Sequence, residues 1–241
     1  MINRLRKFLT AAATPAFWPA LVKGVMPTVE HVEAIQRLAP NTLIDIGANK
    51  GQFSVMAQRL FPTLEIHAFE PLERARAIYK SVLGASARVY PMALGSAVGE
   101  ATFFVTTRAD SSSLLQPASG QERAYGVGAN TSILIPVARL SDVIHIAALK
   151  RPILMKIDVQ GGELDVLRGG EGDLRFIDMI YCEASFVELY RGQPLAAEII
   201  AYLAARHFDL RGVFNLSLTR EFGPTQADFL FLSRAEDAQS R

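Results

Sequence analysis

The run Thr42–Ile46, which is apolar and β-branched and leads directly into the loop GANKG, constrains the fold of this chain most strongly. A short apolar run of this kind predicts a buried β-strand. The residues after the loop, Phe53–Phe61, carry apolar side chains at helical spacing, and Pro62 follows where a helix has to end. A strand, a tight loop and a helix in this order are the opening unit of a parallel α/β sheet.

The same alternation of strands and helices recurs along most of the chain. Further strands are expected at Leu64–Phe69, Arg88–Met92, Ile153–Val159, Met179–Glu183, Phe208–Val213 and Ala227–Leu232, with helices at Leu72–Leu83, Gly162–Arg168 and Leu195–Ala205. This rhythm predicts a doubly wound, mostly parallel α/β sheet. No linker or repeat divides the chain, so we expect one domain over residues 41–235, an N-terminal helical cover over 1–40 and a tail over 236–241.

One stretch breaks the rhythm. Glu100–Thr106 and Ser132–Val137 are expected to be strands, and the polar segment between them shows little periodicity. A connection of this length in a compact domain is often a binding loop. We therefore expect an inserted β-hairpin and loop region that covers a substrate.

The loop after the first expected strand carries the clearest chemical signal. Gly47 and Gly51 allow the backbone to approach a ligand closely, and Asn49 tolerates a left-handed conformation. The spacing differs from the GxGxxG of dinucleotide enzymes. Asp45 stands two residues before Gly47, and a carboxylate there suits a cationic ligand such as S-adenosylmethionine better than a pyrophosphate. A plain structural turn is the alternative.

Glu70 ends the second expected strand and is followed by Pro71. An acid at this position can accept hydrogen bonds from both hydroxyls of a ribose. A solvated acid at a strand end would be the ordinary interpretation, but the pairing with the glycine loop favours a nucleoside site.

A second cluster follows the strand Ile153–Val159. Lys156, Asp158 and Glu163 lie in KIDVQGGE, and Glu183 ends the next strand, so the three carboxylates are expected to meet in one crevice. Carboxylates that lie close together need a positive charge between them. Mg²⁺ held by Asp158, Glu163 and Glu183 would supply it. Lys156, a sulfonium or ordinary salt bridges are the alternatives.

Several classes of protein lack their usual signals here. The formal charge is +1 with no basic stripe, which argues against a nucleic-acid partner. Cys182 is the one cysteine and lies in an apolar run, so it is expected to be buried. The four histidines lie outside the motifs and are expected to be ordinary surface or core residues. HExxH, GxSxG and P-loop motifs are absent.

The N-terminus has basic residues followed by an uncharged stretch from Phe8 to Val22. This stretch is shorter than a membrane span and is interrupted by Pro15 and Pro19. A secretory signal, or a helix on a membrane surface with Phe17 and Trp18 near the headgroups, stays open. A helical cover on the domain is the favoured interpretation.

The motifs taken together resemble the FkbM-type methyltransferases. The resemblance rests on LIDIGANKGQFS, FEP, LMKIDVQGGELDVLRGG, CEASFVELYRGQP and ADFLF, and it spans Thr42 to Leu232. It implies the class I methyltransferase fold, which is Rossmann-like and has a seven-stranded sheet whose last strand is antiparallel. It also implies O-methylation of a small-molecule or glycan hydroxyl, as in sugars, glycolipids and polyketides. S-adenosylmethionine is made in the cytosol, so the resemblance also implies a cytoplasmic location. A contact with the membrane surface is left open.

The resemblance also implies roles for individual residues. The methionine end of the donor would contact Asp45, Gly47, Asn49 and Gly51, the ribose would bind Glu70, and the transferring methyl would face Asp158. Asp158 and Glu183 are the candidates for the base, and Lys156 qualifies only if burial lowers its pKa. The segment before Thr42 and the loop Thr107–Thr131 lie outside the shared motifs and should select the acceptor.

Three alternatives remain at this stage. An N- or protein-methyltransferase of the same fold often carries an aromatic-Pro motif where this chain has DVQGGE. A nicotinamide oxidoreductase would need GxGxxG. A non-catalytic binding module would have kept the fold without the activity. Oligomeric state is left open by the sequence.

Overall fold

The run Thr42–Ile46 is strand β1 of the computed structural model, which describes residues 2–234. All five of its side chains are buried. β1 lies between β2 (Glu65–Phe69) and β7 (Ile153–Ile157) and is parallel to both. A strand covered on both faces of a parallel sheet needs apolar residues at nearly every position, which accounts for the continuous apolar run.

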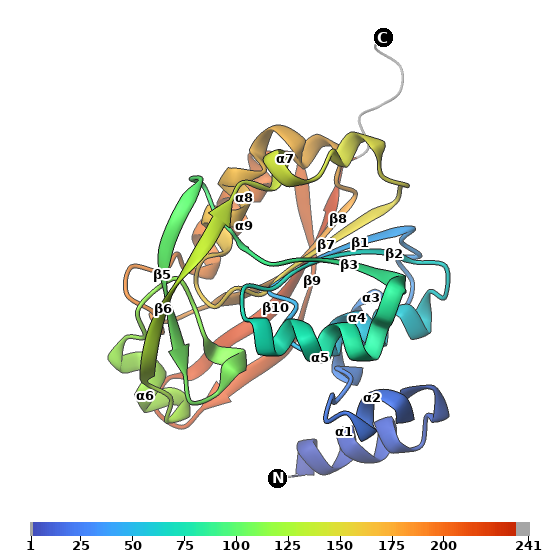
Figure 1. The fold of residues 1–241 in the computed structure, drawn as a ribbon. Helices are drawn as coiled ribbons and strands as arrows, with labels where there is room; N and C mark the ends of the chain where they lie inside the picture. The colour runs from blue at the N-terminus through green and yellow to red at the C-terminus, as the bar shows by residue number, and fades with distance from the viewer. Residues whose placement is uncertain (1, 235–241) are drawn as a thin grey trace.

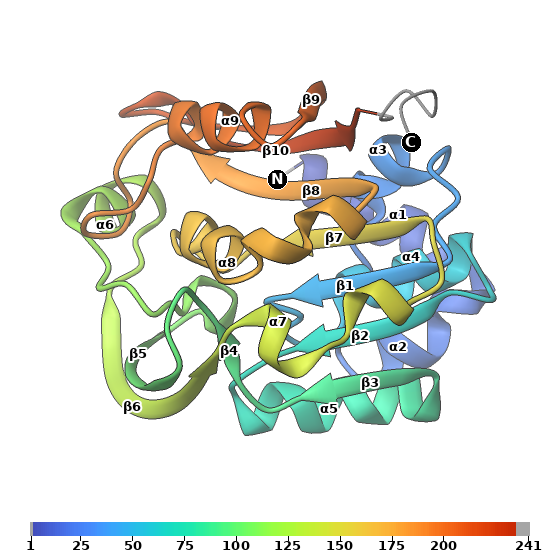
Figure 2. The ribbon, with the colours of Figure 1, turned by 90° about the horizontal axis from the view of Figure 1, so that it is seen from above.

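The described residues form a main sheet of seven strands in the order β3-β2-β1-β7-β8-β10-β9, drawn in Figure 1 and from above in Figure 2. The other strands are β3 (Ala87–Tyr90), β8 (Met179–Ser185), β9 (Phe208–Thr219) and β10 (Gly223–Ser233). β10 is antiparallel to both β8 and β9, while the remaining pairs are parallel. The doubly wound seven-stranded sheet with an antiparallel last strand is confirmed.

The strand order reverses between β1 and β7. From β1 the chain builds outward through β2 to β3, and after the insertion it returns to β7 and continues outward through β8 on the other side. In open α/β sheets the carboxyl ends of the strands at such a reversal leave a crevice for a ligand.

Helices cover both faces of this sheet (Figure 1). One face carries α3 (Val32–Ile35), α4 (Gln52–Leu60) and α5 (Glu73–Leu83), and the other carries α7 (Leu140–Val143), α8 (Glu163–Gly169) and α9 (Ala196–Ala204). Successive side chains of a strand point to opposite faces. Leu43 of β1 accordingly packs into the core beneath α4, and Ile44 into the core beneath α8 and α9.

The inserted region folds into a second, smaller sheet beside the carboxyl ends of the main strands (Figure 2). It contains β4 (Ala93–Leu94), β5 (Gly99–Thr106) and β6 (Ala129–Ala138) in the order β4-β6-β5, and β5 and β6 form an antiparallel hairpin. The connection between them contains α6 (Ser119–Tyr125). The sequence did not predict this helix, because a seven-residue polar segment shows too little periodicity.

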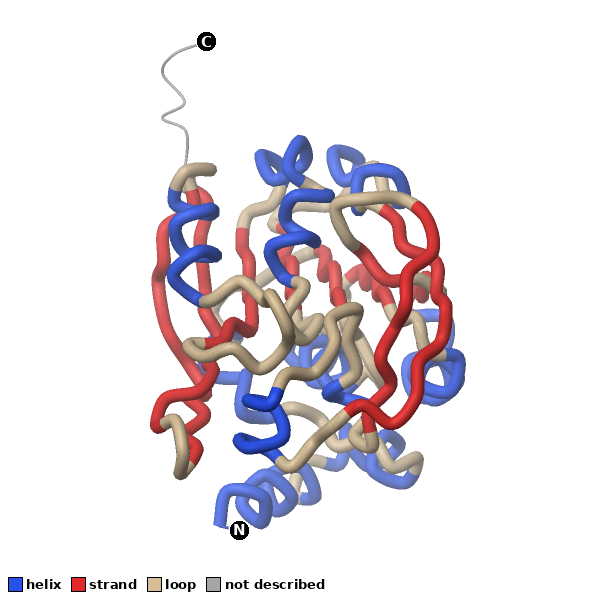
Figure 3. Tube along the Cα trace, turned by 90° about the vertical axis from the view of Figure 1, so that its left-hand side faces the viewer, coloured by secondary structure: helices blue, strands red, loops and turns tan. Residues whose placement is uncertain are grey.

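The N-terminal segment is helical, and Figure 3 shows it at one end of the molecule. It contains α1 (Ile2–Ala12) and α2 (Trp18–Val22). Ala11, Phe17 and Ala20 are buried in a cluster with residues of α4 and α5. Phe17 is therefore part of the core and not a membrane anchor, whereas Trp18 is 56% exposed.

Short 3₁₀ turns complete the fold, at Pro15–Phe17 (η1), Val29–His31 (η2), Gly84–Ser86 (η3), Ala109–Ser111 (η4), Ile146–Ala148 (η5) and Glu171–Phe176 (η6). Within residues 2–234, every helix is too short or too polar to traverse a bilayer. The tail expected over residues 236–241 lies outside the described residues.

Candidate functional site

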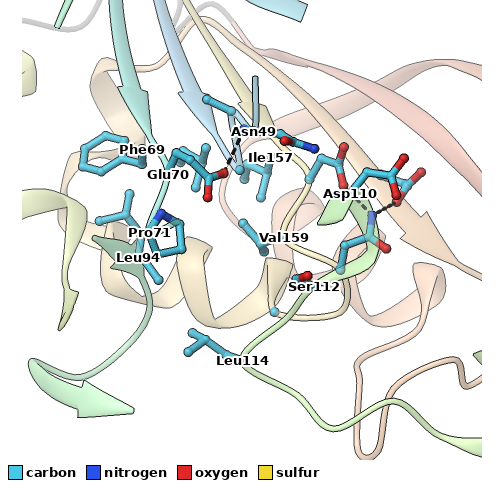
Figure 4. A pocket seen from close by; sticks show the side chains of 18 of the residues that line it. Asn49, Phe69, Glu70, Pro71, Leu94, Asp110, Ser112, Leu114, Ile157 and Val159 are labelled. Atoms are coloured by element: carbon cyan, nitrogen blue, oxygen red, sulfur yellow. Dashed lines mark hydrogen bonds between the residues drawn. The ribbon is translucent and has the colours of Figure 1, made fainter. Parts of the chain in front are cut away.

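A cavity of about 540 Å³ lies at the carboxyl ends of β1, β2, β7 and β8 (Figure 4). Its wall combines these strand ends with the N-terminal residues around His31 and with the inserted sheet around Phe103. This volume is typical of a small-molecule site. The cavity occupies the crevice predicted from the reversal of strand order.

The loop after β1 forms part of the wall through Gly47 and Asn49. Gly47 has a φ of 77°, and a Cβ built there would lie 1.9 Å from the carbonyl oxygen of Asp158, so the two loops meet at their backbones. Asn49 has a φ of 45°, as its left-handed tolerance suggested.

Gly51 does not line the cavity, contrary to the expected ligand contact. It begins α4 with a φ of 90°, and a Cβ there would lie 2.9 Å from the ring of Tyr79. The glycine is required by packing and backbone conformation.

Glu70 lies on the cavity wall and is 5% exposed. The backbone N–H of Asn49 donates to its Oε2 at 2.9 Å, and the N–H of Leu72 donates to its Oε1 at 2.7 Å. Burial raises the pKa of this carboxyl, and the two backbone hydrogen bonds oppose the rise. Each oxygen keeps a lone pair for a hydrogen bond from a ligand hydroxyl.

Apolar side chains line the cavity near Glu70. Figure 4 shows Phe69, Leu94, Ile157 and Val159 around this carboxylate. Such a surface accepts a flat, weakly polar ring beside a group that binds hydroxyls.

Asp45 is wholly buried and does not line the cavity, which corrects the expectation that it touches a ligand. Ser54 donates a hydrogen bond from Oγ to Asp45 Oδ2 at 2.6 Å, and Lys156 Nζ lies 3.2 Å from Oδ1. Both oxygens of Asp45 therefore face groups inside the protein, and the ion pair with Lys156 connects it to the cavity wall.

Lys156 joins the loops of β1 and β7. Its Nζ donates to the carbonyl of Gly47 at 2.9 Å and lies 3.7 Å from Asp158 Oδ2. Burial by itself lowers the pKa of Lys156, but the carboxylates of Asp45 and Asp158 raise it overall. The condition for Lys156 to act as a base is therefore not met, and it stays a buried cation.

Asp158 and Glu183 come together as predicted, and an amide bridges them. Gln160 donates from Nε2 to Asp158 Oδ1 at 2.7 Å and to Glu183 Oε2 at 2.9 Å. The hydroxyl of Tyr190 lies 3.0 Å from Gln160 Oε1 and 2.8 Å from the carbonyl oxygen of Ser111, and it packs the bridging amide in place. The side chain of Asp158 is 38% exposed toward the cavity.

Glu183 lies near the carboxylates of Asp158 and Asp228. Burial raises its pKa well above the ordinary value, and the carboxylates of Asp158 and Asp228 raise it further. A hydrogen bond from Gln226 to Glu183 Oε1 opposes this rise.

The magnesium site expected from Asp158, Glu163 and Glu183 does not form. Glu163 is buried, and its Oε1 accepts hydrogen bonds from the backbone N–H groups of Gly161 and Val159 at 2.9 and 3.2 Å. The amide of Gln160 occupies the space between the other two carboxylates. Residues 2–234 contain no group of three His, Cys, Asp or Glu side chains arranged to hold a metal ion.

His31 and Asp228 form a pair on the cavity wall that no motif in the sequence indicates. His31 Nδ1 lies 3.2 Å from Asp228 Oδ2 and 2.9 Å from the hydroxyl of Tyr181. Burial by itself raises the pKa of Asp228, but hydrogen bonds from His31, Asn215 and Tyr181 lower it overall. ADFLF contains Asp228, yet no local signal connects it to a histidine near the other end of the chain.

The inserted region also reaches the cavity. Arg108, Ser112 and Leu114 line it from the segment after β5, and Gln121 and Tyr125 line it from α6. The loop Thr107–Thr131 is thus part of the cavity wall, and its role in selecting the acceptor stays a prediction.

Comparison with known proteins identifies one family. The model described as the methyltransferase FkbM domain matches residues 45–210. The 2-O-methyltransferase NoeI of Sinorhizobium fredii is 28% identical over 205 residues, covering 81% of this chain and 82% of NoeI. Methyltransferase sdnD of Sordaria araneosa is 28% identical over 211 residues, covering 75% and 79% of the two chains.

Among solved structures, the plantazolicin methyltransferase BpumL in complex with SAH is similar, with a TM-score of 0.49 and 11% identity. The similarity covers 90% of this chain and 86% of BpumL.

Proposed function

Because the chain belongs to the FkbM family of methyltransferases, we propose that it transfers a methyl group from S-adenosylmethionine to a hydroxyl of a sugar, glycolipid or polyketide-type acceptor. The observation that carries the proposal is Glu70, a buried carboxylate with free lone pairs on the cavity wall beside the glycine loop. The relative named a 2-O-methyltransferase supports oxygen as the methylated atom.

The cavity offers unpaired polar atoms that fit the methionine end of this donor. Thr28 Oγ1, Glu30 Oε2 and Asn49 Oδ1 are buried without a hydrogen-bond partner among the described residues, and all three residues line the cavity. Buried polar atoms usually have partners. An ammonium group carries three N–H donors, which these three oxygens can accept.

When bound, S-adenosylmethionine supplies an electrophilic methyl group on a positively charged sulfur. Glu70 accepts the ribose hydroxyls, and the apolar side chains around Phe69 hold the adenine ring. Holding the reacting atoms in line contributes several kcal/mol to catalysis.

Asp158 and Glu183 are proposed to hold the acceptor hydroxyl beside the methyl group. Their carboxylate oxygens face the same cavity and are fixed by Gln160. Each carboxylate accepts a hydrogen bond from another polar group of the acceptor, which fixes the reacting hydroxyl beside the methyl carbon. Mg²⁺ has no part in this proposal, since the carboxylates that would bind it are otherwise engaged.

Calorimetry followed by a turnover assay tests the proposal. We expect S-adenosylmethionine and S-adenosylhomocysteine to bind, and NADH not to bind. Mass spectrometry should then find a methyl group on the oxygen of a methyl glycoside, a glycolipid or a polyketide alcohol. Absence of donor binding would overturn the proposal, and methylation of an amine or a protein would replace the hydroxyl acceptor.

We further propose that residues 41–235 form the methyltransferase domain and residues 1–40 its cover, with a membrane surface as a peripheral contact. Phe8, Leu9 and Val22 of the cover are exposed together with Trp18. Cosedimentation with anionic vesicles, which a Trp18→Ser variant should reduce, tests the contact. Equal sedimentation of the two proteins would argue against it.

A further inference from the structure

One imidazole from the N-terminal cover forms part of the cavity wall. His31 ends the turn Val29–His31, and its ring lies 5.5 Å from the ring of Phe53 and 5.4 Å from that of Tyr181. These two aromatic side chains come from α4 and β8. The ring of His31 is therefore held by elements of the main domain, although the residue lies outside the segment that carries the family motifs.

The two ring nitrogens of His31 have different surroundings. Nδ1 lies 2.9 Å from the Tyr181 hydroxyl, 3.0 Å from the amide nitrogen of Asn215 and 3.2 Å from Asp228 Oδ2. Asn215 and Tyr181 both donate to that carboxylate oxygen, at 2.7 and 3.1 Å. Nε2 makes no hydrogen bond to a described residue and is not among the buried unpartnered atoms. A carboxylate beside Nδ1 favours the proton on that nitrogen, which leaves the Nε2 lone pair available.

The other titratable groups of the cavity already have charged or hydrogen-bonded partners. Lys156 is a cation held by two carboxylates. Each oxygen of Glu183 already accepts an amide hydrogen bond, and Asp158 lies beside the positive charge of Lys156. An alcohol that attacks a methyl group needs a base that works near neutral pH, which an imidazole provides.

We propose that His31 is the general base of methyl transfer and that Asp228 is a positioning residue that holds its ring and tautomer. The proposal rests on the proposed function. As the bond between the acceptor oxygen and the methyl carbon forms, the hydroxyl proton passes to Nε2 of His31. The electron pair of the breaking carbon–sulfur bond stays on sulfur, and the proton later leaves His31 for solvent.

The charged and titratable groups near His31 determine how its protonation affects the rate. Asp228 approaches from β10 and Tyr181 from β8, and Glu30 precedes it in the chain. Glu183 lies opposite Asp228 in the pairing of β8 with β10. The negative groups in this set stabilise the imidazolium that forms when His31 accepts the proton.

A His31→Asn variant tests the base, because asparagine keeps a polar group near Asp228 but cannot accept the proton. With methyl glycosides as acceptors, kcat at pH 7.5 should fall roughly 100- to 1000-fold. The affinity for S-adenosylmethionine should change less than about threefold, the acidic limb of the kcat–pH profile should disappear, and added imidazole should restore part of the rate. His145→Asn, at an exposed histidine outside the cavity, is the matched control.

NMR provides a measurement that needs no acceptor. In protein labelled with ¹⁵N-histidine and saturated with S-adenosylhomocysteine, His31 should carry its proton on Nδ1, and Asp228→Asn should abolish this preference. An Nε2–H tautomer in the unmodified protein would overturn the inference. So would an H31N protein that keeps its donor affinity and a normal kcat. If the unmodified protein does not bind S-adenosylmethionine at all, the result would instead contradict the proposed function.

Discussion

The two ends of the cavity are built in different ways. The donor end, which we define as Gly47, Asn49, Glu70 and Leu72, consists of two loops that follow adjacent parallel strands, and backbone N–H groups fix its one carboxylate. The acceptor end, defined as His31, Asp158, Gln160, Glu183 and Asp228, is held together by side chains from the N-terminal cover and from strands or loops of the second half of the chain.

Because of this difference, we expect one end of the cavity to bind the methyl donor and the other to select the acceptor. A site made from backbone groups of neighbouring loops tolerates changes elsewhere in the chain and keeps one ligand. A site made from distant side chains changes whenever one contributing segment changes. Substitutions at the donor end should therefore alter donor affinity, and substitutions at the acceptor end should alter turnover.

The largest effect is expected from Asp158→Asn. The substitution keeps the size of the side chain but removes a negative charge from the acceptor end, so kcat should fall on the order of 10³-fold. Donor affinity measured by calorimetry should change only a few-fold. Near-normal turnover by D158N would remove Asp158 from the chemistry, and a comparable loss of donor affinity would erase the distinction between the two ends.

A smaller effect is expected on the free energy of unfolding, which should depend on pH through Glu163, a buried residue next to the acceptor end. Burial raises the pKa of Glu163 to about 7, against an ordinary value near 4.5. A folded-state pKa above the unfolded one favours the protonated form, so this stabilisation is complete below about pH 4.5 and is lost as the pH rises through 7. The free energy of unfolding should fall between pH 5 and pH 8 by an amount on the order of 2 kcal/mol.

Urea unfolding of a Glu163→Gln variant, measured at several pH values, checks the predicted pH dependence of stability. Glutamine keeps an oxygen for the N–H groups of Val159 and Gly161 but has no charge to bury, so its free energy of unfolding should depend less on pH. Glu183, whose pKa is also raised, should leave a residual dependence of the same sign. Glu122→Gln, at an exposed position of α6, is the control. An unchanged slope in E163Q would show that Glu163 is not the source.

The smallest effect is expected at the donor end, from Glu70→Gln. The glutamine keeps one acceptor oxygen, but either the N–H of Asn49 or that of Leu72 loses its partner, and the ribose loses a charged acceptor. The Kd for S-adenosylmethionine should rise about 10-fold, while kcat at saturating donor should change less than about threefold. Glu73→Gln, at the exposed start of α5, should leave both values unchanged. A fall in kcat alone would contradict the assigned role.

The strands of the main sheet, the left-handed loop residues and the position of Glu70 could be predicted because each depends on neighbours in the sequence. The ligand contacts expected of Asp45 and Gly51 are not supported by the cavity, because these two positions depend on residues far along the chain. Whether Asp45 faces a ligand or a lysine is decided by β7, and whether Gly51 faces a ligand or a ring is decided by Tyr79 on α5. The spacing of the motifs is the same in either case.

The sequence by itself determined the succession of strands and helices along the chain, the tight left-handed loop after β1, and the carboxylate that ends β2. These features follow from apolar periodicity and from backbone conformations that few residues tolerate. Only the tertiary structure decided which carboxylates meet, that Gln160 lies between two of them, and that His31 faces Asp228. Contacts between side chains far apart in the sequence arise from packing, and packing leaves no local pattern along the chain.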